Sequence, residues 1–353
     1  MAKLKNKDIA EALGLSTAAV SMALNDKPGV SNETRQRVLE YYQSHSAPHQ
    51  HPAALSASRR TLVMIIHKTT GEIIIDKPFF SSLTSSIEIE ARKNGYLLIM
   101  STYDAGFMDL DGYIDSLNLQ RPAGVLILAT ELTEAALLRY QRKLEAPYVL
   151  LDGYIESIPC SSVTLDNSNA MFRAYKYAFE MGHRRIGYLK GNTDIPNFIH
   201  RFDGYCKGIR TFQPDADGRA IVFSFPCNVE GAKKEAEMLL DRLPKNFQLP
   251  TCFLSDLDFI AIGFMTALKE RGYRIPDDVS IIGFDNIEFS AVTEPPLTTI
   301  RLHQQFFGKY AIQLLIDGIE NNVPCHINVR PSSELVIRDS VKKLDAPPKA
   351  PAE

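Results

Sequence analysis

Residues 62–285 alternate between short apolar runs and stretches with the periodicity of a helix, and this alternation restricts the fold more than any other feature of the chain. Apolar runs separated by helical segments predict parallel sheets with helices on both faces. The series is LVMII, YLLIM, GVLIL and YVLLD, followed by SVTLD, RRIGYLKG, AIVFSF, TCFLS and VSIIGFD. Because it falls into two similar halves of about 100–130 residues, we predict an α/β body of two lobes, each with a doubly wound parallel sheet.

Polar side chains stand at the ends of several of these runs. Thr130 follows GVLIL, Asp152 ends YVLLD, Asp258 follows TCFLS, and Asp285 follows VSIIGF. Ligands of open α/β sheets bind beyond the carboxyl ends of the strands. Four polar groups at equivalent ends therefore predict a binding cleft between the lobes. An Asp in this place also serves as a helix cap, and each position taken alone is open to that alternative.

The first 45 residues have a different pattern, with three short helical segments separated by turns. Asn6 and Ser16 are suited to begin the first two helices, Gly14 to end the first, and Ser31 to begin the third. Two short helices joined by a glycine-containing turn predict a helix-turn-helix, whose second helix enters the major groove of DNA. A three-helix packing module with a solvated face is the alternative. The side chains that the second helix directs outward are Thr17, Ala18, Ser21, Met22 and Asn25.

Residues 1–60 are basic, whereas the rest of the chain is acidic. Eight Lys and Arg stand against five Asp and Glu in residues 1–60, and the remaining residues have 31 against 37. A basic segment indicates a polyanionic partner, which we expect to be double-stranded DNA. The five cysteines lie far apart without zinc-ligand spacing, which indicates a protein of the reduced cytoplasm.

The first 45 residues, called the head below, resemble a known family over residues 5–42. The stretch KDIAEALGLSTAAVSMALNDKPGVSNETRQRVLE is similar to the start of lactose repressor (LacI/GalR) regulators, which are bacterial transcription factors. Met22 stands where many members have Arg, and a thioether packs on a thymine methyl instead of gripping guanine, so we expect a different operator half-site. The resemblance implies base contacts by Thr17, Ala18 and Met22, and phosphate contacts by Ser16, Ser21, Asn25, Ser31 and Thr34.

Residues 46–61 form a linker rich in Ser, Ala, Pro and His. By composition it is a flexible tether. The resemblance instead implies a short hinge helix that forms on DNA, with Leu55 wedged into the minor groove. Pro52 and Ala53 depart from the family pattern, and Pro is tolerated only in the first turn of a helix. The HxH spacing of the linker lacks further ligands for a metal, and we expect neither a metal nor a cofactor.

The body resembles the same family from about residue 62 to residue 341, through GHRRIGYLKG, RFDGYCKGI, IPDDVSIIGFDN and PPLTTIR. The implied fold is that of periplasmic sugar-binding proteins, with crossovers near 163, 292 and 326. The N-terminal lobe then has residues 62–163 and 293–325, the C-terminal lobe has 164–292 and 326–341, and 342–353 form a disordered tail.

The resemblance also implies an effector site between the lobes, for which a sugar or glycoside is the expected ligand. Leu257 and Gly153 replace polar residues common in the family, and HKTTGEIIID at residues 67–76 is longer than usual, so the effector is expected to be an unfamiliar one. The implied contacts are the aromatic pair Phe79 and Phe80, the anchor Arg201, the acceptor Asp285, and Thr130, Asp152 and Asn197.

Two other classes of protein fit the sequence less well. An exported solute-binding protein would share the body, but the chain starts without an apolar export signal and contains no membrane-spanning run. An enzyme on this scaffold would need a phosphate-binding glycine loop or a nucleophile elbow, and neither motif occurs. We therefore predict a cytoplasmic repressor without enzymatic activity. It would bind a near-palindromic operator as a homodimer, and its effector would act by allostery.

Overall fold

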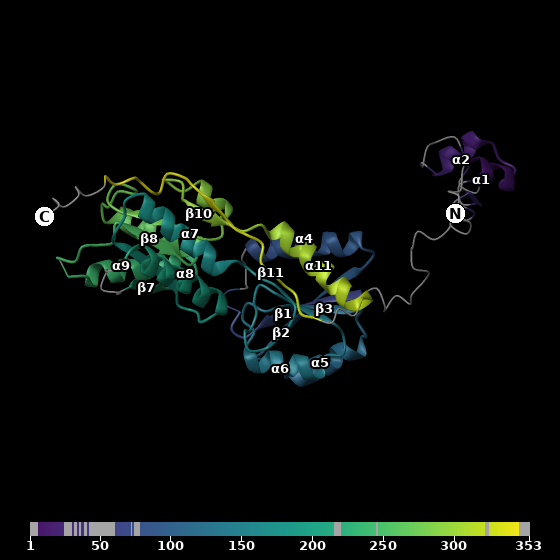
Figure 1. The fold of residues 1–353 in the computed structure, drawn as a ribbon, viewed down its shortest axis with the longest axis horizontal. Helices are drawn as coiled ribbons and strands as arrows, with labels where there is room; N and C mark the ends of the chain where they lie inside the picture. The colour runs from purple at the N-terminus through teal and green to yellow at the C-terminus, as the bar shows by residue number, and fades with distance from the viewer. Residues whose placement is uncertain are drawn as a thin grey trace. The chain divides into compact units, whose positions relative to one another are not determined.

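The computed structural model describes residues 6–24, 30, 31, 34, 37, 38, 41, 61–71, 73, 78–214, 220–244, 246–321 and 325–345 (Figure 1). The chain divides into two compact units, Met1–Ser56 and Ala57–Glu353. The first unit is the predicted head with part of the linker, and the second is the body. Among the described helices, none has the length and apolar character needed to cross a bilayer.

The head contains the predicted pair of short helices, α1 (Asn6–Leu13) and α2 (Thr17–Leu24). Gly14 has a φ of +66°, which glycine adopts without strain and which ends α1. The Ser16 hydroxyl accepts a hydrogen bond from the Ala19 N–H at 3.1 Å and so begins α2, as its sequence position predicts. The small core of the head consists of Ile9, Ala10, Val20, Ala23 and Val38.

The N-terminal lobe has a six-stranded parallel sheet in the order β11-β5-β4-β3-β1-β2. Helices α4 and α11 pack together over one face, and α5 and α6 cover the other (Figure 1). The strands are β1 (Thr61–Lys68), β2 (Leu97–Asp104), β3 (Gly124–Leu128), β4 (Tyr148–Leu151), β5 (Ser162–Val163) and β11 (Asn328–Val329). The helices are α4 (Pro78–Lys93), α5 (Leu110–Leu119), α6 (Glu134–Lys143) and α11 (Gln304–Glu320).

The C-terminal lobe has a four-stranded parallel sheet in the order β7-β6-β8-β9. Alternate side chains of β6 enter different apolar clusters, with Tyr188 among the residues of α7 and α8 and Leu189 among those of α9 and α10. Both faces of the sheet are thus covered. The elements are β6 (Ile186–Gly191), β7 (Ile221–Phe225), β8 (Cys252–Ser255), β9 (Ser280–Ile282), α7 (Asn167–Glu180), α8 (Pro196–Phe212), α9 (Val229–Arg242), α10 (Asp258–Glu270) and a 3-10 turn, η2 (Glu288–Ala291).

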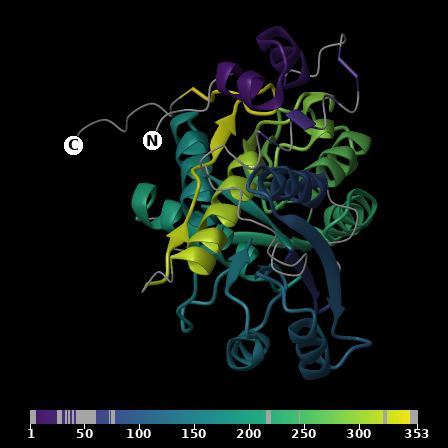
Figure 2. The same ribbon diagram turned by 90° about the vertical axis from the view of Figure 1, so that its right-hand side faces the viewer.

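The segments that cross between the lobes differ from the predicted boundaries. Thr298 and Arg301, at the two ends of the segment that contains β10 (Thr299–Arg301), form bridges with Ile282 and Asp285, so this segment belongs to the C-terminal lobe. Strand β11 pairs with β5 and therefore belongs to the N-terminal lobe. The chain then returns as β12 (Glu334–Val336), antiparallel to β10, and this yellow segment runs along both lobes in Figures 1 and 2. Strands of two or three residues have no periodicity that a sequence pattern could reveal.

Part of the predicted tail is folded. The Lys342 N–H donates to the Ser280 hydroxyl at 3.2 Å, and the Leu344 N–H donates to the Met181 carbonyl at 2.7 Å. The segment 342–345 thus packs on the C-terminal lobe, and the rest of the predicted tail, 346–353, lies outside the described residues.

Candidate functional site

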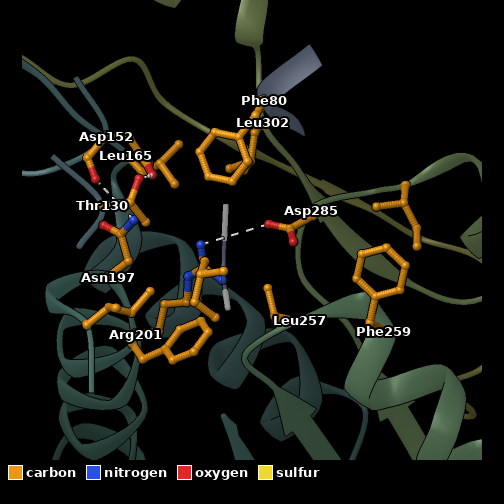
Figure 3. Close-up of a pocket in the computed structure, with 14 residues that line it drawn as sticks. Phe80, Thr130, Asp152, Leu165, Asn197, Arg201, Leu257, Phe259, Asp285 and Leu302 are labelled. Atoms are coloured by element: carbon orange, nitrogen blue, oxygen red, sulfur yellow. Dashed lines mark hydrogen bonds and ion pairs between the residues drawn. The ribbon is translucent and has the colours of Figure 1, made fainter. Parts of the chain in front are cut away.

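A cavity lies between the two lobes at the carboxyl ends of their strands, where the sequence predicts a cleft. Its volume is about 40 Å³. Figure 3 shows Thr130, Asp152 and Asn197 on one side of the cavity, Arg201 near its centre, and Asp285 beyond Arg201. The polar lining residues are these five. The apolar lining residues are Ile73, Phe80, Leu165, Ile195, Phe198, Leu257, Phe259, Ile287 and Leu302.

Asp152 is the buried carboxylate on the N-terminal lobe's side of the cavity. It follows β4 with a φ of +56°, a left-handed conformation that costs a non-glycine residue energy and recurs at functional sites. The Thr130 hydroxyl donates to Asp152 Oδ2 at 2.6 Å, whereas Oδ1 has no hydrogen-bond partner among the described residues. Burial raises the pKa of Asp152 to about 6. A ligand hydroxyl or N–H would satisfy this orphaned oxygen.

Arg201 is the cation at the centre of the cavity and is almost fully buried. Its Nε donates to Asn167 Oδ1 at 2.9 Å, and its Nη1 donates to the Asp256 carbonyl. Its Nη2 lies 3.8 Å from Asp285 Oδ1, and the guanidinium stacks on the Phe284 ring at 3.7 Å. These contacts fix the plane and the position of the guanidinium, so that it can donate to a pair of ligand oxygens.

Asn197 connects the two lobes at this site. It lies in the first turn of α8, and its Nδ2 donates to the main-chain carbonyl of Asp152 at 3.1 Å. Its Oδ1 accepts from Asn167 Nδ2 at 2.8 Å. Because Asn167 also accepts from Arg201, one chain of hydrogen bonds runs from the Asp152 carbonyl to the central guanidinium.

Asp258 does not line the cavity, although the sequence places it with the predicted site residues. It is the first residue of α10 and is fully buried. Its carboxylate accepts from the Ile287 N–H at 3.0 Å, from the Ser290 hydroxyl at 2.5 Å and from the Thr299 hydroxyl at 2.6 Å. Asp258 braces the turn η2 and β10 against α10, a structural role close to the helix-cap alternative.

The aromatic pair is only partly described. Phe80 lines the cavity from the first turn of α4, whereas Phe79 is helical and its side chain lies outside the described residues. Sequence reasoning missed most of the apolar lining and the supports of Arg201. A signal was present on α8, where Phe198 stands three residues before Arg201 and therefore on a neighbouring part of the helix surface.

The head presents α2 as the candidate DNA-binding surface. Thr17 and Ala18 are exposed, and Ser21 and Met22 are half-buried. The Ser31 hydroxyl accepts from the Thr34 N–H at 3.2 Å and begins a third helix, which contains the buried Val38. Ser16 and Ser31 thus act as helix caps, and any phosphate contacts would be additional. Asn25, Leu55 and the linker histidines lie outside the described residues, and the described part of the chain has no metal-binding cluster.

Comparisons with known proteins match both parts of the chain. Residues 6–46 match the family of bacterial regulatory proteins called the lacI family, and residues 175–341 match the periplasmic binding protein-like domain. The repressor CytR of Escherichia coli (strain K12) is 32% identical over 96% of each chain. A CelR–cellobiose complex has a TM-score of 0.69 at 22% identity and covers 96% of this chain and 100% of that one. The lac repressor dimer bound to operator and the anti-inducer ONPF has a TM-score of 0.69 at 21% identity, with 97% and 100% covered.

Proposed function

The chain belongs to the lacI family of bacterial regulatory proteins, and from this premise we propose that it is a cytoplasmic repressor whose affinity for operator DNA is set by a small effector in the cleft. It is a transcriptional regulator rather than an enzyme. The observation that carries the proposal is the presence in one chain of an exposed helix-turn-helix surface and of a cavity lined by polar groups from two lobes.

The effector is a sugar or glycoside. Carboxylates such as Asp152 and Asp285 accept from ligand hydroxyls, Arg201 donates to ligand oxygens, and the Phe80 ring offers a face for a sugar ring. The similar CelR structure holds cellobiose, which supports this class of ligand. Asp258 does not contact the effector and contributes to the site only by stabilising the fold of the C-terminal lobe.

The operator is bound by a homodimer. Strand β2 lies at the edge of its sheet, where Leu97, Ile99 and Met100 are exposed apolar side chains that a second copy would cover. A twofold dimer places two heads on the half-sites of a near-palindrome, as in the similar lac repressor dimer bound to operator. The bases are contacted by Thr17, Ala18 and Met22, and Leu55 enters the minor groove. The phosphates are contacted by Ser16, Ser21, Asn25, Ser31 and Thr34.

Effector binding moves the lobes. A cavity of about 40 Å³ is far below the ~300 Å³ of a small ligand pocket. The lobes or the lining side chains must therefore separate before a sugar enters. Such a motion changes the spacing of the two linkers in a dimer, and DNA affinity then follows the preference of the effector for one arrangement.

A selection from random duplex DNA tests the head. The full chain should enrich a near-palindrome, and its affinity should fall steeply with salt because phosphates are contacted. Met22→Arg should shift the enriched half-site towards a guanine. Met108→Arg, on an exposed loop of the body, is the matched control and should leave the sequence unchanged. No enrichment over competitor by the wild-type chain would contradict the proposed function.

A further inference from the structure

The segment that follows β1 is fastened to the N-terminal lobe by one buried carboxylate. Glu131 Oε2 accepts from the N–H groups of Thr69, Thr70 and Gly71 at 2.9, 2.8 and 2.8 Å, and Oε1 accepts from the Ile73 N–H at 3.4 Å. Glu131 is only 6% exposed. Four main-chain donors around one carboxylate form a nest for an anion, here filled by the protein itself.

Two further features fix the path of this segment. The Thr69 hydroxyl donates to the Glu131 main-chain carbonyl at 2.8 Å, so the segment is bound to the main chain as well as to the carboxylate. Gly71 has a φ of +80°, a conformation that lets successive N–H groups converge on one oxygen. The segment lies within HKTTGEIIID, the stretch at residues 67–76 that is longer than usual for the family resemblance.

Ile73 is the residue of this segment that reaches the C-terminal lobe. It is 6% exposed and belongs to the apolar cluster of the C-terminal lobe, together with Ile195, Phe198 and Leu257. The same four side chains line the cavity between the lobes. A residue anchored on one lobe thus takes up space among the apolar residues of the other.

We propose that Ile73 is a specificity-determining residue that limits the size of the apolar part of an effector, and that Glu131 is the positioning residue that holds Ile73 in the cleft. The proposal rests on the proposed function of the cleft as an effector site. The wall around Ile73 is apolar, so the part of a ligand that meets it is an apolar substituent rather than a hydroxyl group.

Room exists next to the cavity for a longer substituent. A second hollow of about 320 Å³ is lined on one side by Thr69, Thr70 and Glu131, and on the other by Thr193 and Ile195. Ile195 lines both hollows, so they adjoin at this residue. Shortening residue 73 would enlarge the smaller cavity on its apolar side.

The test compares methyl and n-butyl β-D-glucoside by calorimetry with the full chain. Ile73→Ala removes as many side-chain carbons as butyl adds to methyl. The ratio of butyl to methyl affinity should therefore rise about tenfold or more, because each buried methylene favours binding. Ile158→Ala is the matched control, since Ile158 is also 6% exposed but lies in the N-terminal lobe's core away from the cavity. An unchanged ratio in Ile73→Ala, or an equal rise in Ile158→Ala, overturns the proposal.

Glu131→Gln tests the positioning role. It should raise the same ratio by a smaller factor, because Ile73 is then held less firmly, whereas Glu88→Gln on the surface of α4, which lines neither hollow, should not. Hydrogen exchange of the wild-type and variant chains provides a measurement that needs no ligand. Glu131→Gln should speed exchange at residues 69–73 and in the segment 195–199 that faces Ile73. Unchanged exchange in either segment would contradict the anchoring.

The two measurements separate this proposal from the proposed function. If neither glucoside binds any variant but exchange responds as expected, the placement of Ile73 is supported and the sugar assignment fails. If the glucosides bind and the ratio does not move, the effector site is supported and the role of Ile73 is overturned.

Discussion

Asp152 in the N-terminal lobe and Asp258 in the C-terminal lobe are both buried near the ends of strands, but they have different hydrogen-bond partners. Asp152 directly follows β4, and Asp258 begins α10 three residues after β8. Both are almost fully buried, and burial raises the pKa of each to about 6. Asp152 has one carboxylate oxygen without a partner among the described residues. Both oxygens of Asp258 accept hydrogen bonds from neighbouring segments. A buried strand-end carboxylate can bind a ligand only where the fold leaves one of its oxygens without a hydrogen-bond partner.

The difference arises from the path of the chain after each strand. After β8, helix α10 begins at Asp258, and the chain later returns through η2 and β10 to supply three donors to that carboxylate. After β4, the chain turns at Asp152, and Thr130 on the neighbouring strand end donates a hydrogen bond to the side chain. A carboxylate that stabilises the fold accepts hydrogen bonds from several segments, whereas a carboxylate that binds a ligand needs an oxygen without a partner in the protein.

Asp258→Ala should give the largest effect on stability and no direct effect on the cavity. Three donors on Ile287, Ser290 and Thr299 would lose their acceptor inside the C-terminal lobe. We expect the free energy of unfolding to fall by about 3–5 kcal/mol, the usual size when buried partners of a charge are left unpaired. Urea unfolding of the full chain measures this loss. A decrease below about 1 kcal/mol would contradict the bracing role.

Asp152→Asn should show the reverse pattern. The carboxylate is costly to bury, so its loss should leave the free energy of unfolding at pH 7 nearly unchanged or slightly higher. Effector affinity should fall by about 10- to 100-fold, because a hydrogen bond to a charged acceptor is lost. Calorimetry with a bound glucoside measures this. Asp258→Asn is the paired control, and a larger loss of affinity there than in Asp152→Asn would break the comparison.

The regular elements of the body were predictable because their patterns are local. Strand β3 spans the predicted GVLIL, since a buried apolar run of this length between helical segments identifies a strand. The short strands β5 and β11 pair across more than 160 residues, and no local pattern marks their partnership. The lobe boundaries near 292 and 326 depended on such pairings.

The site was predictable only in its polar part. Thr130, Asp152, Asn197, Arg201 and Asp285 do meet at one cavity. Asp152 directly follows β4 and Asp258 stands three residues after β8, and the hydrogen bonds that distinguish the two come from residues far from Asp258 along the chain. The nest around Glu131 could not be predicted for the same reason, because a Glu after a strand gives no sequence signal that distant N–H groups converge on it.

The pH dependence of stability gives the smallest effect and concerns what the two aspartates share, because burial raises the pKa of both to about 6. A pKa of about 6 in the folded state, above the ordinary 3.8, means that folded Asp152 binds a proton more tightly than unfolded Asp152. Its contribution to stability is therefore greatest below pH 4 and decreases as the pH rises to about 6. His67 and His183 act in the opposite direction, because burial lowers the pKa of each to about 4 and stability falls as the pH drops below 6.5.

Subtracting the Asp152→Asn profile from the wild-type profile removes the histidine contribution, which both proteins share. The stability of the wild type relative to the variant should decrease by about 2 kcal/mol between pH 4 and pH 7 and stay constant above that. Urea unfolding at several pH values measures the difference, with Asp194→Asn at an exposed position as the control. Parallel profiles for the wild type and Asp152→Asn would show that Asp152 is already ionised in acid. Such a result would contradict the raised pKa of Asp152 but not its difference from Asp258 in hydrogen-bond partners, because burial raises the pKa of both residues to about 6.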